Sequence, residues 1–510
     1  MPSRKTTLRV GAALLAAVAG LSLAAAPASA AQQTIPDGPA LARQLVKKVT
    51  ITGINRHLIA LQRIADRNGG NRAAGTTGHE ASAEYIATKL EDAGFILTRQ
   101  EFPFVYDQTL GQSLTVGGTA VPVARMTYSA STPTGGATGP LVVVPTDASP
   151  GCETSDYDGL AAEGAIVLVS RGFCPFGQKA DIAGQVGAAG VLIYNNVPGS
   201  LGGSLGGPIE GSAPAGGLSQ ADGAALAARD GATVALNLRG VTEDRTSYNV
   251  IAETRTGRHE NVVMAGSHLD SVAVGPGIND NGSGSSALLE TALRLGSSPK
   301  VNNAVRFAWW SAEELGLVGS EHYVRSLSFD EQLNIALYLN FDMIGSPNAG
   351  YFVFDGDNSD GVGAGPGPYG SAQIEAAFAN YFDVTGVPTE GRDFDGRSDY
   401  GEFILNGIPA GGLFTGAEVV KTPAQAAKWG GVAGESFDPC YHQACDNLGN
   451  VDRVALDRNS DAIAFVLGSY AISTEDINGV PPRGARAKTR TAEKRSVSVD
   501  KVNDRDLSIS

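Results

Sequence analysis

Hydrophobic and polar positions divide the first half of the chain into two stretches with different periods. From about Val49 to Gln100, apolar residues recur at three- and four-residue intervals, interrupted by glycines, and this spacing predicts amphipathic helices. From Phe104 to about Thr246, short runs of Val, Ile and Leu are separated by Gly, Pro and Ser. This second pattern is typical of a β-rich module with turns at short intervals.

After residue 247 the chain alternates between two kinds of apolar segment. Residues 261–270, 305–314 and 334–343 are predicted to be buried strands, and residues 284–295 form the predicted helix after the first of them. Alternation on this scale implies βαβ units. The sequence therefore predicts an α/β fold with a mixed, mostly parallel sheet flanked by helices.

The first thirty residues are predicted to be a secretory signal peptide rather than part of the fold. A basic start is followed by an apolar stretch over residues 10–25 and by the small-residue cleavage signal Ala28-Ser29-Ala30. No later stretch approaches the ~20 consecutive apolar residues of a membrane span. We therefore expect residues 1–30 to be removed and the mature protein to be exported and soluble.

The charge of the chain narrows its possible partners. The full sequence carries a formal net charge of −15, and the leader contributes three cations and no acids, so the mature chain is near −18. A chain this acidic is a poor partner for nucleic acid or for anionic membranes. We therefore expect neither as a ligand.

The four cysteines are predicted to form two disulfides. An even count in an exported chain favours disulfide bonds, and the spacing suggests that Cys152 pairs with Cys174 and Cys440 with Cys445. The alternative is a cysteine-based metal site, which usually presents its cysteines in twos, two to four residues apart. The observed spacings do not fit that pattern.

Charged residues stand at the end of each predicted strand of the second half. His268 and Asp270 end the first strand, Glu313 and Glu314 follow the second, and Asp342 follows the third. In an open α/β sheet, ligands collect at the carboxyl ends of the parallel strands. So many carboxylates in one place would repel one another strongly unless cations were bound. The pattern therefore predicts a metal site.

The predicted ligand set fits two adjacent metal ions. Imidazole and carboxylate ligands suit zinc, and two ions that share one carboxylate need a second histidine. His442 supplies it, because it lies between Cys440 and Cys445. Taken singly, each motif has a simpler explanation: a lone histidine is usually a surface or hydrogen-bonded residue, and a Glu-Glu pair is usually solvated. The four remaining histidines are interpreted in that way: His57, His79, His259 and His322.

A set of motifs resembles a known enzyme family. The runs "SHLDSV", "GINDNGSG", "SAEELGLVGS", "LNFDMIG", "GRSDYGEF" and "CYHQACD" are similar, in order and spacing, to those of the co-catalytic di-zinc aminopeptidases. That family includes aminopeptidase Y and the secreted bacterial leucyl aminopeptidases. The resemblance covers roughly residues 45–105 and 247–475, and it implies the zinc exopeptidase fold.

The segment between the two matching parts resembles a protease-associated (PA) domain. The run "GAIVLVSRGFCPFGQKADIAGQVGAAGVLIYNN" carries this likeness. The resemblance implies a β-rich PA domain at 108–246, inserted between peptidase parts at 31–107 and 247–478. The tail, 479–510, is expected to be disordered or removed on maturation.

The resemblance implies a metal role for five residues. Asp280 would bridge two zinc ions, His268 and Asp342 would complete one site, and Glu314 and His442 the other. The family also has a non-proline cis peptide after the bridging aspartate, which would here join Asp280 to the following asparagine.

Five further residues receive roles from the same resemblance. Glu313 would be the general base that takes a proton from a zinc-bound water, and Asp270 would orient the imidazole of the first ligand. Tyr441 would stabilise the developing oxyanion. Arg397 and Phe414 match family positions near the substrate.

A calcium site found in some secreted members is only partly matched. Asp457 and Asp461 correspond to its carboxyl-terminal part, but Lys47-Lys48-Val49 stands where its amino-terminal partner would be. This departure speaks against calcium.

The resulting hypothesis is a secreted, zinc-dependent aminopeptidase that acts on peptides and proteins with a free amino terminus, with a preference for apolar first residues. One alternative is a carboxypeptidase of the same fold, which would need a basic pocket for which Arg397 alone gives thin support. A single-zinc glutaminyl cyclase is disfavoured because all five ligands are present. A non-catalytic binding ectodomain is disfavoured because such proteins lose metal ligands.

Overall fold

The computed structural model describes residues 38–363, 365–478, 486–487 and 490. The predicted signal peptide and most of the predicted tail lie outside these residues. Arg490 is buried, and its guanidinium donates to the carbonyls of Gln332 and Ile335. Within the described part of the chain, no helix has the length and apolar character needed to cross a membrane.

Three helices precede the first strand. They are α1 (Gly38–Lys48), α2 (Ile51–Arg67) and α3 (Thr77–Asp92). The predicted helical stretch was drawn too long, because β1 (Ile96–Val116) begins before Gln100. The reason is local: Gly94 adopts a left-handed conformation with φ of 83°, which ends the helical turn and redirects the chain.

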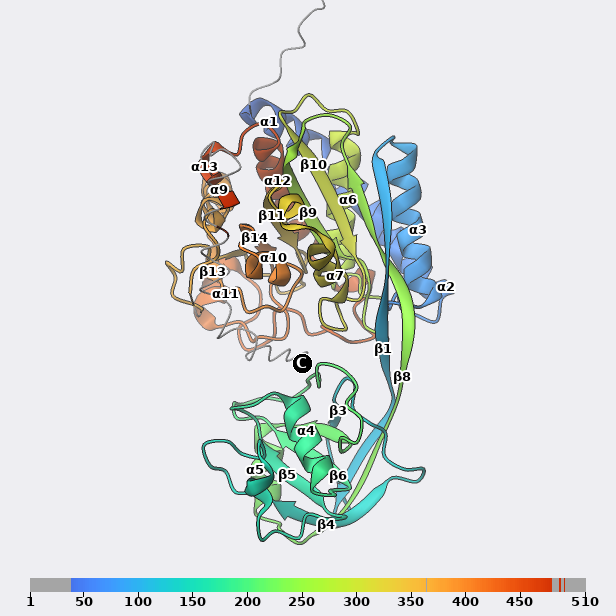
Figure 1. Cartoon of the computed structure of the whole chain (residues 1–510). Coiled ribbons are helices and arrows are strands. Elements are labelled where there is room, and N and C mark those ends of the chain that lie inside the picture. The colour runs from blue at the N-terminus through green and yellow to red at the C-terminus, as the bar shows by residue number, and fades with distance from the viewer. Residues whose placement is uncertain (1–37, 364, 479–485, 488–489, 491–510) are drawn as a thin grey trace, which may run out of the picture. The chain divides into compact units, whose positions relative to one another are not determined.

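The second part of the chain builds the predicted sheet. Strands β9, β10, β11 and β14 run parallel, with β9 between β10 and β11, and antiparallel strands flank them on both sides (Figure 1). The mixed, mostly parallel sheet is therefore confirmed. The strands of this part are β8 (Thr233–Glu253), β9 (Arg258–His268), β10 (Asn303–Trp310), β11 (Ile335–Phe341), β12 (Phe352–Phe354), β13 (Glu390–Arg392) and β14 (Ala410–Phe414).

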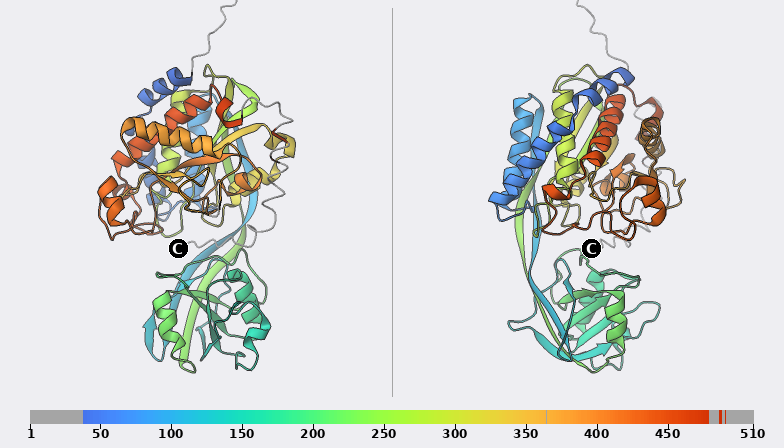
Figure 2. Two further views of the ribbon diagram at one scale, coloured as in Figure 1. Left: turned by 90° about the vertical axis from the view of Figure 1, so that its left-hand side faces the viewer. Right: turned by 180° about the vertical axis from the view of Figure 1, so that it is seen from behind.

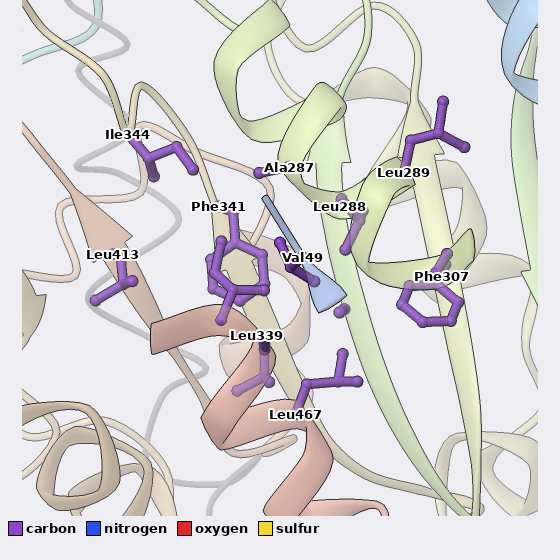
Figure 3. Packing of buried hydrophobic residues seen from close by; sticks show 14 of the residues in the cluster. Val49, Ala287, Leu288, Leu289, Phe307, Leu339, Phe341, Ile344, Leu413 and Leu467 are labelled. Carbon is purple, nitrogen blue, oxygen red and sulfur yellow. The ribbon is translucent and has the colours of Figure 1, made fainter. Parts of the chain in front are cut away.

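Strands of this sheet bury both faces. Val263 and Ala265 of β9 belong to the larger apolar cluster, whereas Val262 and Met264 belong to a second cluster on the opposite face. This alternation is the two-residue period of a strand. The larger cluster is shown from close by in Figure 3, where side chains of β10, β11 and β14 meet those of α6 and α12.

The helices that follow the strands cover these faces. α6 (Gly282–Leu295) contacts α2 and α12, and α1 also packs on α12 (Figure 2). The helices of the second part are α6, α7 (Val318–Ser326), α8 (Phe329–Gln332), α9 (Ser371–Thr385), α10 (Gly401–Leu405), α11 (Pro423–Trp429), α12 (Arg453–Tyr470) and α13 (Glu475–Asn478).

Residues between β1 and β8 form a β-rich unit with its own core. Its strands β4 to β7 are parallel neighbours, and β3 pairs with β7 in the antiparallel sense. The elements are β2 (Thr119–Val121), β3 (Ala124–Arg125), β4 (Ala137–Val143), β5 (Ile166–Ser170), α4 (Phe176–Gln185), β6 (Gly190–Tyr194), β7 (Ala215–Leu218) and α5 (Gln220–Ala227). The sequence pattern missed both helices because they are short.

Two long strands connect this unit to the larger sheet. β1 and β8 pair in the antiparallel sense from Ile96 opposite Glu253 to Val116 opposite Val234 (Figure 1). Both strands continue across the boundaries expected near residues 107 and 246, and their register shifts between Thr109 and Gly111.

The histidine of α3, His79, is buried inside the protein rather than exposed at its surface. His79 is only 1 % exposed, and the backbone of Tyr248 is its hydrogen-bond partner. Of the two alternatives in the interpretation, a surface or a hydrogen-bonded histidine, the first does not apply to His79 and the second agrees with its bond to the backbone of Tyr248. The interpretation also holds for His57, which bonds to Tyr85 and Glu290, and for the half-exposed His259.

Because His79 is buried, we expect the free energy of unfolding to decrease at acid pH. Burial lowers the pKa of His79 to about 4 from an ordinary value of about 6.5. The unfolded chain therefore binds a proton at this residue at a higher pH than the folded chain does. The stabilisation is complete above about pH 6.5 and is lost as the pH falls toward 4, by about 2 kcal/mol at pH 5.

Denaturant unfolding of the wild type and of His79→Leu at pH 8 and pH 5 measures this contribution. We expect the variant to lose about 2 kcal/mol less stability than the wild type over that interval, since leucine binds no proton. Equal losses in the two proteins would show that His79 does not carry the effect.

Candidate metal centre

The strand ends bring the predicted ligands together. β9 lies between β10 and β11, and the last residue of β9, His268, pairs with Trp310 at the end of β10. Glu313 and Glu314 follow β10 after a tight turn in which Ala312 has φ of 59°. Asp342 follows β11 directly. The shared edge of the parallel strands thus places one imidazole and three carboxylates in one region.

Asp280 lies between the two histidines. Its Oδ1 is 3.3 Å from Nε2 of His268, and its Oδ2 is 3.2 Å from Nε2 of His442. It precedes α6, whose N-cap is Asn281, and the peptide bond joining these two residues is cis, as the resemblance implied. One carboxylate therefore presents one oxygen to each imidazole.

Each histidine also faces a second carboxylate. Nε2 of His268 is 3.3 Å from Oδ1 of Asp342, and Nε2 of His442 is 3.0 Å from Oε2 of Glu314. Glu313 is more distant, with its Oε2 3.9 Å from Nε2 of His268. The structure thus arranges two sets of donors, one around each histidine, that meet at Asp280.

The chemistry of this cluster fits divalent metal. Donor atoms of His268, Asp280 and Glu314 all lie within 4.8 Å of one another, and so do those of His268, Glu313 and Asp342. Oε1 of Glu314 is buried and has no hydrogen-bond partner among the described residues. A buried acceptor of this kind needs a compensating ligand, and a metal ion can provide it.

Proton affinities in the cluster show the same need for positive charge. Burial raises the pKa of Glu313 well above its usual range, and the charges of Asp342, Asp399 and Glu314 raise it further against the opposing effect of His268. Burial and the charge of Asp280 raise the pKa of Glu314 to about 7. Raised pKa values of this kind show that the crowded, buried carboxylates would be stabilised by additional positive charge.

The histidines respond in the opposite direction. Burial acts to lower the pKa of His442, but the carboxylates of Glu314 and Asp280 outweigh it and raise the pKa to about 10. The pKa of His268 is likewise well above its usual range, because Asp342 and Glu313 outweigh its burial. Metal ions would displace these protons, as metal binding to histidine sites does in general.

Asp270 supports the turn that carries the two glutamates. Its carboxylate accepts from the backbone N–H groups of Glu313 at 3.2 Å and Glu314 at 3.3 Å. Its Oδ1 is 3.8 Å from Nδ1 of His268, while that nitrogen lies 3.2 Å from the backbone carbonyl of Asp270. The side chain therefore contacts the glutamate turn more closely than the imidazole it was expected to orient.

The sequence did not single out Ser398, although it stands inside the quoted motif "GRSDYGEF". Its hydroxyl donates to Oδ2 of Asp342 at 2.6 Å and accepts from the side chain of Asn340 at 2.8 Å. These bonds fix the carboxylate that faces His268. A motif match locates such a residue but does not reveal its partner.

Tyr441, Arg397 and Phe414 line one cavity with the predicted ligands Asp280, Asp342 and His442 and with the predicted base Glu313. The guanidinium of Arg397 donates to Oη of Tyr441 at 3.3 Å and pairs with Glu418 at 2.7 Å. Glu418 also escaped notice in the sequence, since nothing in its neighbours marks it. The structure therefore brings both expected substrate-pocket residues to the metal cluster.

Both predicted disulfides are present in the structure, Cys152–Cys174 and Cys440–Cys445. The second closes a six-residue loop around His442, whose φ of 55° is in the left-handed region. Asp457 and Asp461, by contrast, belong to no group of three or more candidate metal ligands among the described residues.

Comparison with known proteins finds matches to two families along this chain. Residues 249–467 match the profile of Peptidase family M28, and residues 137–226 match that of the PA domain. A probable lipoprotein aminopeptidase of Mycobacterium tuberculosis, LpqL, is 47 % identical over 90 % of this chain and 93 % of its own length. The chain belongs to peptidase family M28.

Two further relatives support the assignment of this M28 peptidase. Leucine aminopeptidase 2 of Trichophyton rubrum is 44 % identical over 87 % of this chain and 88 % of its own length. The structure of a zinc aminopeptidase from Bacillus subtilis is similar with a TM-score of 0.61 and 26 % identity, covering 83 % of this chain and 96 % of that one. The predicted family, the inserted PA domain and the enzyme class, an aminopeptidase, are thus confirmed, and zinc is the metal that the family implies.

Proposed function

We propose that this M28 aminopeptidase binds two zinc ions that share Asp280 and uses Glu313 as its general base. The observation that carries the proposal is the division of the Asp280 carboxylate, whose two oxygens lie 3.3 and 3.2 Å from different imidazoles. His268 and Asp342 would hold one ion, and His442 and Glu314 the other. Each imidazole nitrogen and carboxylate oxygen in this set is a ligand that zinc accepts.

When bound, zinc would lower the pKa of a water molecule and polarise the scissile carbonyl. Glu313 is placed to take the proton of the attacking water, because its Oε2 lies 3.9 Å from Nε2 of His268, farther than the 3.3 Å of the ligand Asp342. Burial raises the pKa of Glu313 above its usual range, which favours a carboxylate that takes up a proton in the reaction. Glu313 would then return that proton to the leaving amine as the C–N bond breaks.

Two other groups would act on the substrate directly. The Tyr441 hydroxyl would donate to the carbonyl oxygen as negative charge develops on it, with Arg397 holding the phenol in place. The free α-ammonium group would be held by the carboxylates of Glu313 and Asp342, which line the same cavity. An acetylated amino terminus lacks this charge and would not be held.

An apolar first residue fits one wall of this cavity. Met343, Phe354, Phe414 and Ala417 line it beside the metal ligands. The leucine aminopeptidase among the relatives supports the same preference. The predicted leader, together with two disulfides and no free cysteine, supports secretion.

A mass-spectrometric time course on one leucine-initiated peptide tests this function. The peptide would be supplied free and N-acetylated, each with and without a zinc chelator, and the zinc content of the enzyme would be measured in parallel. We expect stepwise loss from the free amino end only, abolished by the chelator, with two zinc ions per chain. Loss from the carboxyl end, or cleavage that is indifferent to chelator, would overturn the proposal.

A further inference from the structure

Arg72 is a buried cation next to the metal centre. It lies in the loop between α2 and α3, is 0 % exposed, and is among the largest fully buried side chains of the protein. Burying a guanidinium is costly unless its donors and its charge are both compensated. The partners of Arg72 show how this is done.

The guanidinium binds three backbone carbonyls of one loop. Nε donates to Pro276 at 2.8 Å, Nη2 donates to Gly277 at 2.5 Å, and Nη1 donates to Leu269. The backbone of Arg72 also exchanges bonds with Ser271: its N–H donates to the Ser271 hydroxyl at 2.9 Å, and its carbonyl accepts from the Ser271 N–H at 3.3 Å. One residue thus fixes both ends of the loop 269–277, which joins His268 to Asp280.

The other side of this loop is held by an acid. Oδ1 of Asp446 accepts from the N–H of Asn279 at 2.8 Å, and Oδ2 accepts from the N–H of Asp280 at 2.9 Å. Asp446 directly follows Cys445 of the disulfide loop that carries His442. The segment that ends at Asp280 is therefore held by hydrogen bonds that its carbonyls accept from Arg72 and that its amides donate to Asp446.

The close approach of the guanidinium depends on a glycine. Gly277 has φ of 59°, and a Cβ there would lie 2.3 Å from the carbonyl oxygen of Asp280 and 3.2 Å from Nη2 of Arg72. Any other residue would push the loop away from the guanidinium or strain its backbone. Glycine at position 277 thus provides the space that the guanidinium of Arg72 needs.

The positive charge of Arg72 also interacts with carboxylates of the metal centre. The carboxylates that act on it are Asp270, Asp446, Asp280 and Glu314. Burial lowers the pKa of Arg72 to about 10, which still leaves it charged at neutral pH. A fixed positive charge here offsets part of the repulsion among these carboxylates, in addition to what bound metal contributes.

We propose that Arg72 is a positioning residue for the zinc centre, which sets the place of Asp280 through three carbonyls and balances the surplus of carboxylates. The inference rests on the proposed two-zinc function. Lysine keeps the positive charge but cannot reach three divergent carbonyls, because only the planar guanidinium spreads its donors in that way. Arg72→Lys therefore separates the geometry from the charge.

The test compares Arg72→Lys with a matched control, Arg125→Lys. Arg125 lies in the β-rich unit and is also buried. Its guanidinium donates to both carboxylate oxygens of Asp107 and to the carbonyl of Ser129. The measurements are zinc affinity by competition with a chelator, thermal unfolding of the metal-free proteins, and kcat and KM on a leucine-initiated peptide.

We expect Arg72→Lys to lose at least tenfold in zinc affinity, as happens when groups that hold metal ligands are removed. We also expect kcat to fall by about tenfold with KM within twofold, whereas Arg125→Lys keeps wild-type zinc affinity even if its unfolding temperature drops. Wild-type zinc affinity and kcat in Arg72→Lys, with only the metal-free protein destabilised, would show that Arg72 merely stabilises the fold and would overturn the inference.

A second variant and the zinc content of the wild type distinguish the role of Arg72 from the proposed function. If Arg72→Lys does not fold, Ser271→Ala takes its place, because it removes the hydroxyl that accepts from the Arg72 backbone. Severalfold weaker zinc binding in Ser271→Ala supports the inference, and unchanged binding opposes it. Failure of the wild type to bind two zinc ions would instead contradict the proposed function, whatever the variants do.

Discussion

Glu313→Gln is expected to lower kcat by about a thousandfold, within the range that general-base removal causes, while the zinc content stays at the wild-type value. Glutamine has nearly the same shape but cannot take a proton from the attacking water. The backbone N–H of residue 313 would still donate to Asp270, so the turn that carries the ligand Glu314 should keep its form. Steady-state kinetics on a leucine-initiated peptide, with metal analysis of the same samples, measures both quantities.

A second buried glutamate provides the control for this variant. Glu290 lies on α6, is 1 % exposed, and binds His57 and Arg294 rather than the metal cluster. Glu290→Gln should keep kcat within twofold, even where stability declines. If Glu313→Gln retained more than a tenth of the wild-type activity, the base would have to be sought elsewhere, and an equal fall in zinc content would make Glu313 a ligand instead.

Asp280→Ala is expected to weaken zinc binding at both sites, whereas His442→Ala should weaken it at one. The Asp280 oxygens face His268 and His442 separately, so their loss removes a donor from each set. His442 faces only Asp280 and Glu314 among the predicted ligands. Mutation of a residue that merely supports a metal ligand lowers metal affinity about ten- to a hundredfold. Removal of a ligand itself should therefore lower zinc affinity on the order of a hundredfold or more.

Zinc per chain at a fixed free zinc concentration distinguishes these variants. The wild type should hold two ions, His442→Ala one, and Asp280→Ala fewer than one, with no detectable peptidase activity in Asp280→Ala. His259→Ala is the matched control, since this half-exposed histidine pairs with Glu253 away from the site. Loss of a single ion in Asp280→Ala would mean that this carboxylate does not bridge the two sites.

The sequence predicted the central strands well because their signal is local. Runs such as residues 335–339 are uniformly apolar, as expected for strands buried on both faces, and β11 extends from Ile335 to Phe341 with every residue buried. Short elements were predicted less well. α4 and α5 lie within glycine-rich sequence whose composition resembles that of turns.

Most of the candidate site also followed from local pattern. Charged residues directly after buried strands must gather at one edge when the strands are parallel neighbours, whatever the details of the fold. His268, Glu314 and Asp342 could be grouped on that ground alone. His442 needed the count of zinc ligands and the resemblance to a family, because no strand precedes it.

The amino-acid sequence by itself thus predicted the central strands and the charged residues at their ends, since each depends on neighbouring residues and their spacing. Only the tertiary structure decided which oxygen of Asp280 faces which histidine, and that Arg72 and Asp446 hold the loop between them. Arg72 bonds to the carbonyl of a residue 205 positions away. Such contacts depend on how separate elements pack and on side-chain direction, which no local period encodes.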